Sequence, residues 1–254
     1  HANIDYTNEE NLIPGRGYMA AIDKDSYLSN TGTLNNGDVT IQLTANAPDD
    51  DAPDGFFTYD KGSNLIGNPY QAYLDLGKVH TKTGFSTFYV YDAEMNSYVP
   101  FVAGASKNPV ISQYVHPHQG FFVLKDASAD ENFTFTYDMA TASTDEGSYF
   151  RGGINYPLVN LFVNDGKGHC DLTIIEFGRP MLGGAFKTNA LRNSNFKIGA
   201  YLDGKNYGLL YVPEGTQRVP VHFKTNEDGV FTLTWGTYNG TFTSLILVDN
   251  LTGT

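Results

Sequence analysis

The chain of 254 residues has a single cysteine, Cys170, and only 16 lysines and arginines against 28 aspartates and glutamates. One cysteine excludes an intrachain disulfide and a zinc-ribbon framework. Its alternation with Leu172 and Ile174 in the stretch CDLTIIEF predicts a buried thiol on a strand, which serves as a small apolar side chain. The net charge of −12 argues against nucleic acid as a partner, because binding to phosphates needs a basic surface.

Long apolar runs and recognisable chain ends are also missing. No run approaches the roughly 18–20 apolar residues of a transmembrane helix, so the sequence predicts no membrane span. The chain starts at His1 rather than at a methionine, carries no signal peptide and stops at VDNLTGT without an obvious cap. We therefore expect it to be a piece of a longer protein.

Helical periodicity is nearly absent, whereas strand signals are frequent. Only AFKTNALRN, residues 185–193, predicts a short helix or 3-10 turn. Strand-like alternation is clear at Val39, Ile41 and Leu43, which share one face while the threonines and glutamine between them share the other. A helical bundle is therefore not expected.

Asn-Gly and Asp-Gly pairs adjoin several of the alternating runs. Such dipeptides favour two-residue β-hairpin turns, because both residues tolerate positive φ angles. The four pairs are Asn36-Gly37, Asp203-Gly204, Asp228-Gly229 and Asn239-Gly240. Together with the alternation they predict an all-β fold built from antiparallel strands.

A change of composition near the middle of the chain suggests two domains. The stretch ATASTDEGS, residues 140–148, is small and acidic and separates two strand-rich regions. We place the boundary near residue 146 and predict two antiparallel β-sandwich or jelly-roll-like domains in tandem, residues 1–146 and 147–254. We expect the two domains to pack together.

Several motifs follow one another along nearly the whole chain. They are LIPGRGYMAAI, SNLIGNPYQAYLDL, FYVYDAEMNSYVP and VHPHQGFFVL in the first half, and YPLVNLFVND, DLTIIEF, VPVHFKTNEDGVFTLTW and SLILVDNLTG in the second. As a set they resemble C-terminal-region β modules of large secreted or cell-surface proteins of the Bacteroidetes, adhesins among them. In those proteins such modules commonly precede a secretion or sorting domain. The resemblance implies an extracellular or outer cell-surface location and a structural role more than an activity.

Two positions depart from the pattern of that family. Lys187 stands where an acidic residue is usual, and Asn189-Ala190 stands where the family often has Asp-Ala. A side-chain cap or ion contact made by those acids is therefore not carried over to this chain.

The stretch GSNLIGNPY, residues 62–70, has the composition of a structural corner. Gly67 permits a positive φ or a close backbone approach, and the proline after Asn68 drives that residue toward extended geometry. We expect the side chains of Asn64 and Asn68 to bond neighbouring backbone groups. A second motif, PHQGFF, turns the chain into a strand. The residues of this structural motif are Asn64, Gly67, Asn68, Pro69, Tyr70, Gly120 and Phe121.

Two groups of residues are candidates for binding a metal ion. Asp49, Asp50, Asp51 and Asp54 lie in one short loop, and Ca²⁺ takes about six to eight oxygen ligands. The loop is not an EF-hand, because alanine and lysine occupy two of the required ligand positions, and a solvated acidic loop is the competing interpretation. The second candidate is the pair His116 and His118, for which the sequence offers no third ligand and a plain turn is the alternative. No other cofactor is expected.

Short-range enzyme fingerprints are absent from the sequence. It contains no G-x-S-x-G, H-E-x-x-H, P-loop or G-x-G-x-x-G motif, so we predict no catalytic residues. The sequence then favours a non-catalytic structural or adhesive module, which presents or anchors other domains of the same polypeptide and contacts a glycan or host-surface ligand.

Two other function classes stay open at this stage. A carbohydrate-binding module is the first, because aromatic residues are plentiful; against it, Trp235 alternates with Phe231 and Leu233 as a core residue does. The second is a hydrolase with dispersed carboxylates, whose spacing arises only in the fold.

Overall fold

A computed structural model describes residues 12–19, 32–44, 63–93, 97–105, 112–124, 130–142, 156–180, 182–187 and 195–253. Across these ranges the chain is mostly strand, with a single α-helix, and the all-β fold class is confirmed. The sandwich form of the domains and the boundary near residue 146 stay predictions, since residues 143–155 lie outside the described ranges. No described helix is long and apolar enough to cross a membrane.

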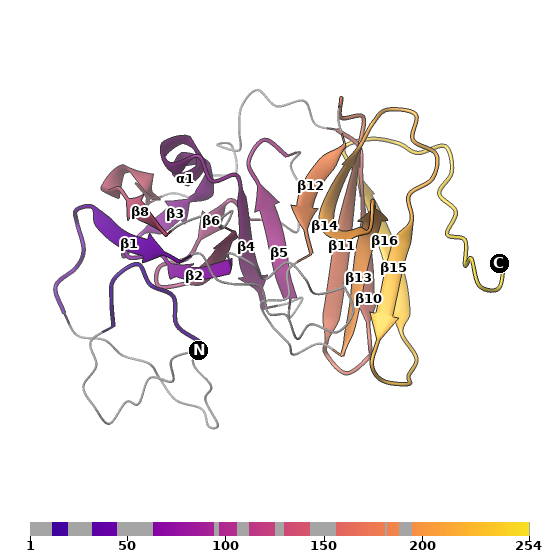
Figure 1. The fold of residues 1–254 in the computed structure, drawn as a ribbon, viewed down its shortest axis with the longest axis horizontal. Coiled ribbons are helices and arrows are strands. Elements are labelled where there is room, and N and C mark those ends of the chain that lie inside the picture. Colours follow the sequence, from indigo (N-terminus) through magenta and orange to yellow (C-terminus); the bar gives the residue numbers. More distant parts are fainter. Residues whose placement is uncertain are drawn as a thin grey trace.

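The described residues of the first half form three small antiparallel sheets (Figure 1). One pairs β1 (Val39–Leu43) with β8 (Glu131–Phe135). The largest has the order β2 (Ser63–Gly67), β7 (Gly120–Leu124), β4 (Thr87–Asp92) and β5 (Ser97–Val102). The third has the order β6 (Tyr114–Val115), β3 (Tyr73–Asp75) and β9 (Ala140–Thr141), the last preceded by the 3-10 helix η2 (Tyr137–Met139).

These sheets enclose one apolar core. The alternation noted on β1 buries Ile41 and Leu43, while Phe133 and Phe135 come from its partner β8. Phe88 and Phe121 add rings from the four-stranded sheet, and the ring centroids of this pair lie 6.1 Å apart. Alternating residues on separate sheets thus point into a common interior, as expected for strands with one buried face.

Helix α1 (Leu76–Thr83) covers part of this core and was missed by the sequence analysis. The Asp75 side chain accepts a hydrogen bond from the Gly77 N–H at 2.9 Å, and Gly84 ends the helix with φ of 78°. The helix expected at residues 185–193 is wrong where it can be examined, because Gly183–Phe186 forms strand β12. Residues 188–193 lie outside the described ranges.

In the second half, the residues that the structure describes form one seven-stranded sheet. Its path is β15 (Val221–Thr225), β13 (Phe196–Leu202), β14 (Lys205–Val212), β11 (Cys170–Phe177), β10 (Leu158–Asn164) and β16 (Thr232–Tyr238), with β12 also pairing with β14. One pair departs from the antiparallel expectation, because β11 and β14 run parallel with Ile174 opposite Leu209. Parallel neighbours need a long crossover, and residues 178–204, which include β12 and β13, provide it.

Only one of the four predicted two-residue hairpins joins paired strands within the described part of the chain. Asp203 and Gly204 have φ angles of 49° and 79° and connect β13 to β14. The prediction is wrong at Asp228-Gly229, because β15 pairs with β13 and β16 pairs with β10. Asn36-Gly37 precedes β1, whose partner is the distant β8, and Asn239-Gly240 follows β16 without a paired strand after it among the described residues.

The two groups of strands meet through an apolar seam in which β5 lies against the seven-stranded sheet (Figure 1). Because alternate residues of a strand point to opposite faces, Leu209 belongs to the seam while Leu210 belongs to a separate core on the other face. The buried residues of the seam are Tyr89, Val99, Val102 and Phe122 from the first half, and Leu158, Leu172, Ile174, Ala185 and Leu209 from the second.

Candidate functional site

The two motifs of the predicted structural corner lie side by side. Strands β2 and β7 pair so that Gly67 stands opposite Gly120 and Ile66 opposite Phe121. A methyl group on Gly67 would lie 3.3 Å from the Arg16 carbonyl oxygen, which leaves little room for a side chain. The glycine therefore serves a close backbone approach, and it is not among the glycines with positive φ.

Asn68 is a buried amide that ties three chain segments together. Its Nδ2 group donates to the carbonyl oxygens of Ala72 at 2.8 Å and His116 at 3.1 Å, and it also lies 3.3 Å from that of Val115. Its Oδ1 atom accepts from the Tyr70 N–H at 3.0 Å, across Pro69. Such bonds replace the strand pairing that the backbone loses at the corner.

The other two polar residues of the corner also contact the main chain. Asn64 Oδ1 accepts from the Thr44 N–H at 2.9 Å, and Asn64 Nδ2 donates to the Thr44 carbonyl at 3.1 Å, both at an exposed position. The Tyr70 hydroxyl lies 3.0 Å from the Phe135 carbonyl oxygen, and burial raises the pKa of Tyr70 to about 12, with Asp38 and Asp138 adding to the shift. The corner is thus a backbone junction.

The two histidines proposed as metal ligands contact other side chains. His118 has a φ of 62° and its Nε2 atom bonds the Gln71 side chain, whereas the His116 ring packs edge-on against Tyr73 with centroids 5.0 Å apart. The described residues contain no group of three or more His, Cys, Asp or Glu that could hold a metal ion. The acidic run Asp49, Asp50, Asp51 and Asp54 lies outside the described ranges.

A buried ion pair beside the seam is the most strongly polar feature of the second half. Lys187 Nζ lies 2.6 Å from Asp171 Oδ1, and the two side chains are 6% and 1% exposed. Ser97 of β5 donates to the same oxygen at 3.2 Å, so a residue of the first half joins the pair. Asp171 Oδ2 accepts from the Ile198 N–H at 2.8 Å, and Lys187 also donates to the Leu172 carbonyl.

Thr173, two residues further along β11, also accepts a hydrogen bond from the β13 backbone. Its hydroxyl donates to the Tyr207 carbonyl at 2.8 Å and accepts from the Ala200 N–H at 3.0 Å. Asp171 and Thr173 share a face of β11 and therefore supply acceptors for alternate N–H groups of β13. Side chains thus satisfy backbone groups in the region before β11 begins to pair with β14.

A second buried carboxylate, Glu176, lies further along β11. It forms an ion pair with Arg179, whose guanidinium carbon lies 4.7 Å from the ring centroids of both Tyr156 and Tyr211. Arg179 also donates to the Gly104 carbonyl of the first half. Planar guanidinium groups stack well on aromatic faces, so this arginine both neutralises a buried charge and contacts the other group of strands.

Cys170 precedes Asp171 and is half-buried rather than fully buried as the sequence predicted. Burial raises the pKa of its thiol, and the negative charge of Asp171 raises it further. The thiolate is therefore disfavoured at neutral pH, which is the opposite of what a nucleophilic cysteine needs.

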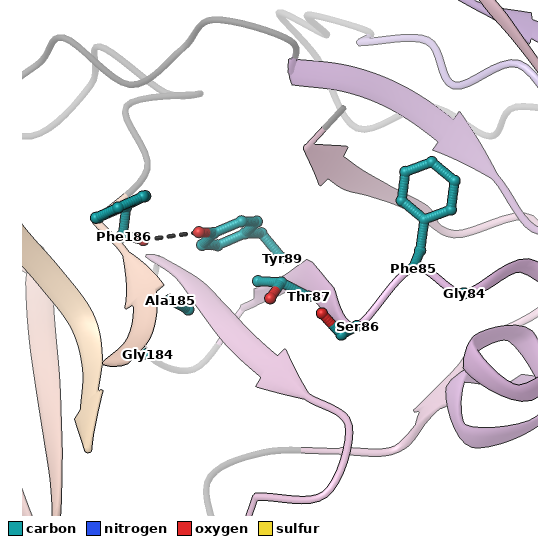
Figure 2. Close-up of a pocket in the computed structure, with 8 residues that line it drawn as sticks. All are labelled: Gly84, Phe85, Ser86, Thr87, Tyr89, Gly184, Ala185 and Phe186. Carbon is teal, nitrogen blue, oxygen red and sulfur yellow. Dashed lines mark hydrogen bonds between the residues drawn. The ribbon is translucent and has the colours of Figure 1, made fainter. Parts of the chain in front are cut away.

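A pocket of about 310 Å³ opens where the chain after helix α1 passes strand β12 (Figure 2). At one side the Tyr89 hydroxyl donates to the Phe186 carbonyl at 2.7 Å, and Phe85 lies on the far side from Phe186. Hydroxyl groups of Ser86 and Thr87 line the space between. The described lining residues include no carboxylate, histidine or cysteine; they are Gly84, Phe85, Ser86, Thr87, Tyr89, Gly184, Ala185 and Phe186.

Trp235 differs from its predicted place in the core. It is 51% exposed on β16, although Phe231 and Leu233 on the same face pack against a buried cluster. Trp235 lies opposite Leu161 of β10, but β16 is the last strand of its sheet, so no described strand covers its other side. The alternation therefore predicted the face correctly but not the depth of burial.

The Asn68 network predicts a stability loss on mutation. Asn68→Ala should lower the free energy of unfolding by about 1–3 kcal/mol, because the buried Tyr70 N–H and the carbonyls of Ala72 and His116 lose their partner. Asn64→Ala, which removes bonds at an exposed site of the same motif, should cost less. Urea unfolding of the two variants checks this, and equal losses would contradict it.

The Asp171–Lys187 pair predicts a larger loss. Lys187→Met should cost about 3–5 kcal/mol, because it leaves a buried carboxylate without its counter-charge. The matched control is Lys82→Met, since Lys82 Nζ lies 2.7 Å from Asp138 Oδ2 in a pair whose side chains are 48% and 59% exposed. That exposed pair should contribute little to stability, because solvent screens the two charges. Similar midpoints of urea unfolding for the two variants would count against the buried pair.

Comparison of the chain with protein-family models, with curated proteins and with solved structures finds no match.

Proposed function

We propose that the chain is a non-catalytic structural module of a secreted or cell-surface bacterial protein, which presents or anchors other domains of the same polypeptide. The observation that carries the proposal is the seam, where buried residues of both groups of strands form one continuous apolar cluster. Such a cluster resists independent motion of the parts it joins, because separating them exposes apolar surface to water.

Polar contacts across the seam support the same function. The Tyr89 hydroxyl bonds Phe186, Ser97 bonds Asp171, and Arg179 bonds Gly104. Each contact uses a buried or half-buried group whose loss leaves a partner unsatisfied. These contacts and the nine buried residues of the seam favour a fixed orientation of the two groups of strands, which a spacer needs and a hinge does not.

A surface at the other end of the molecule supports a role beside further domains. Exposed large apolar residues are frequent on β15, on β16 and in the chain around and after them, and these strands lie at the side away from β1 and α1 (Figure 1). Exposed apolar side chains in such number are typical of surfaces that contact another protein or domain. The residues are Phe223, Val230, Trp235, Leu245, Ile246, Leu247, Val248 and Leu251.

Carbohydrate binding is the second candidate, and the pocket where the chain after α1 passes β12 favours it. Its volume of about 310 Å³ suits a small sugar, and hydroxyl groups beside aromatic side chains are the surroundings that a sugar uses. The exposure of Trp235 also removes the argument that the single tryptophan belongs to the core. A hydrolase with dispersed carboxylates has no such supporting observation among the pocket's described lining residues.

The structural function predicts that both groups of strands unfold as one unit. Ile198→Ala, a change buried in the second half away from the seam, should lower amide protection on β7 as much as on β14. Hydrogen exchange followed by mass spectrometry measures both segments at once. Loss of protection confined to the seven-stranded sheet would contradict a single rigid module.

The non-catalytic part of the proposal has a separate test. Turnover of a glycoside, ester or peptide substrate by the purified chain would contradict it.

The carbohydrate candidate predicts a ligand that competes for the pocket. A glycan that binds saturably on an array should lose at least about tenfold in affinity in Ser86→Trp, because the new ring fills the cavity. Trp235→Ala should leave that affinity unchanged, since Trp235 does not line the pocket. Titration calorimetry with the glycan found on the array checks both variants. Loss of affinity in Trp235→Ala alone would place the binding site on β16. If no glycan binds saturably, the carbohydrate-binding function is contradicted.

A further inference from the structure

Asp171 and Lys187 come together from positions far enough apart in sequence to close a loop. Asp171 is the second residue of β11, and Lys187 directly follows β12. Their reactive groups lie within 2.6 Å in surroundings that admit almost no water. The nitrogen and oxygen atoms of the Lys82–Asp138 pair are nearly as close, but those side chains are exposed to solvent. The two pairs therefore differ in burial and not in the distance between their charged atoms.

Hydrogen-bond accounting favours an amide over an ion pair at this position. An ammonium group has three donor hydrogens, and the described residues offer Lys187 Nζ two acceptors, Asp171 Oδ1 and the Leu172 carbonyl. An amide between the two side chains keeps one hydrogen, for which the Leu172 carbonyl is in place. Its single oxygen, Asp171 Oδ2, already accepts from the Ile198 N–H at 2.8 Å.

We propose that Asp171 and Lys187 condense into an isopeptide bond between Asp171 Cγ and Lys187 Nζ. In this step one proton passes from Nζ to Oδ1, which leaves an amine that can act as a nucleophile and a hydroxyl that can leave as water. Nζ then attacks Cγ, and the developing negative charge on Oδ2 is held by the Ile198 N–H. Ser97 donates to the leaving oxygen Oδ1.

The step balances without a further reagent. The Cγ–Nζ bond forms, the Cγ–Oδ1 bond breaks, and Oδ1 leaves as water with two hydrogens that started on Nζ. No atom is oxidised or reduced. Neighbouring groups only orient the reactants and exclude water, which also protects the product from hydrolysis.

The bond would give this chain a covalent cross-link, which it cannot obtain from a disulfide. With one cysteine the chain has no intrachain disulfide. The isopeptide closes the loop from residue 171 to residue 187 and fixes β11 to the end of β12, both of which contribute residues to the seam. A cross-link of this kind restricts the unfolded chain as a disulfide does.

Intact-mass spectrometry of the folded, purified chain tests the proposal. The expected mass is lower than that calculated from the sequence by one water molecule. Cleavage at Glu176, which lies between the two partners, should then leave the fragments on either side joined in a branched product. An aspartyl succinimide at Asp171 also loses one water but would leave those fragments separate, and that result overturns the proposal.

Two variants complete the test. Lys187→Arg keeps the charge but offers no amine of the same kind, so it should show the full calculated mass and a lower melting temperature. Lys82→Arg, in the exposed pair at nearly the same distance, should still be one water lighter than calculated. A full calculated mass in the unchanged chain, with cooperative unfolding to show that it is folded, overturns the proposal regardless of the variants.

Discussion

The carboxylate of Asp171 is the constraint on which the junction between the two groups of strands depends. A carboxyl group whose side chain is 1% exposed is tolerated only when its oxygens have hydrogen-bond partners. Lys187, Ser97 and the Ile198 N–H supply them from three different segments. The order of strands around this point is therefore tied to one side chain, because displacing any of those segments leaves a buried oxygen without a partner.

The same residue explains how a parallel pair fits into a sheet that is otherwise antiparallel. Strand β11 pairs with β14 only from Ile174 onward, and before that point it lies beside β13. Asp171 and Thr173 accept hydrogen bonds from the Ile198 and Ala200 N–H groups there. Side-chain oxygens thus take the place of carbonyls where the backbones do not pair, and the sheet continues without unsatisfied donors at those two residues.

The sequence was informative wherever a signal and its partner lie close together. Alternation at Ile41 and Leu43 gave the buried face of β1, and the positive φ tolerance of Asp203-Gly204 gave the hairpin between β13 and β14. Helix α1 could have been found from Asp75 as its N-cap and Gly84 just beyond its end, which are local signals that were overlooked. Strand partners were not predictable from local signals. Strands β1 and β8, for example, pair although their residues are about ninety positions apart in the sequence.

Asn68 and Lys187 show why one polar contact could be predicted from the sequence and the other could not. Asn68 bonds the Tyr70 N–H and the Ala72 carbonyl, so its role as a corner residue follows from the neighbouring Pro69 and from its short side chain. Lys187 was noticed only as a departure from an acidic position, because its counter-charge lies 16 residues away, on strand β11. A lysine in a short apolar stretch has no local feature that distinguishes a solvated side chain from a buried one. Its function is decided by which carboxylate the topology brings to it, and in this chain the topology brings one that is already held by Ser97 and the β13 backbone.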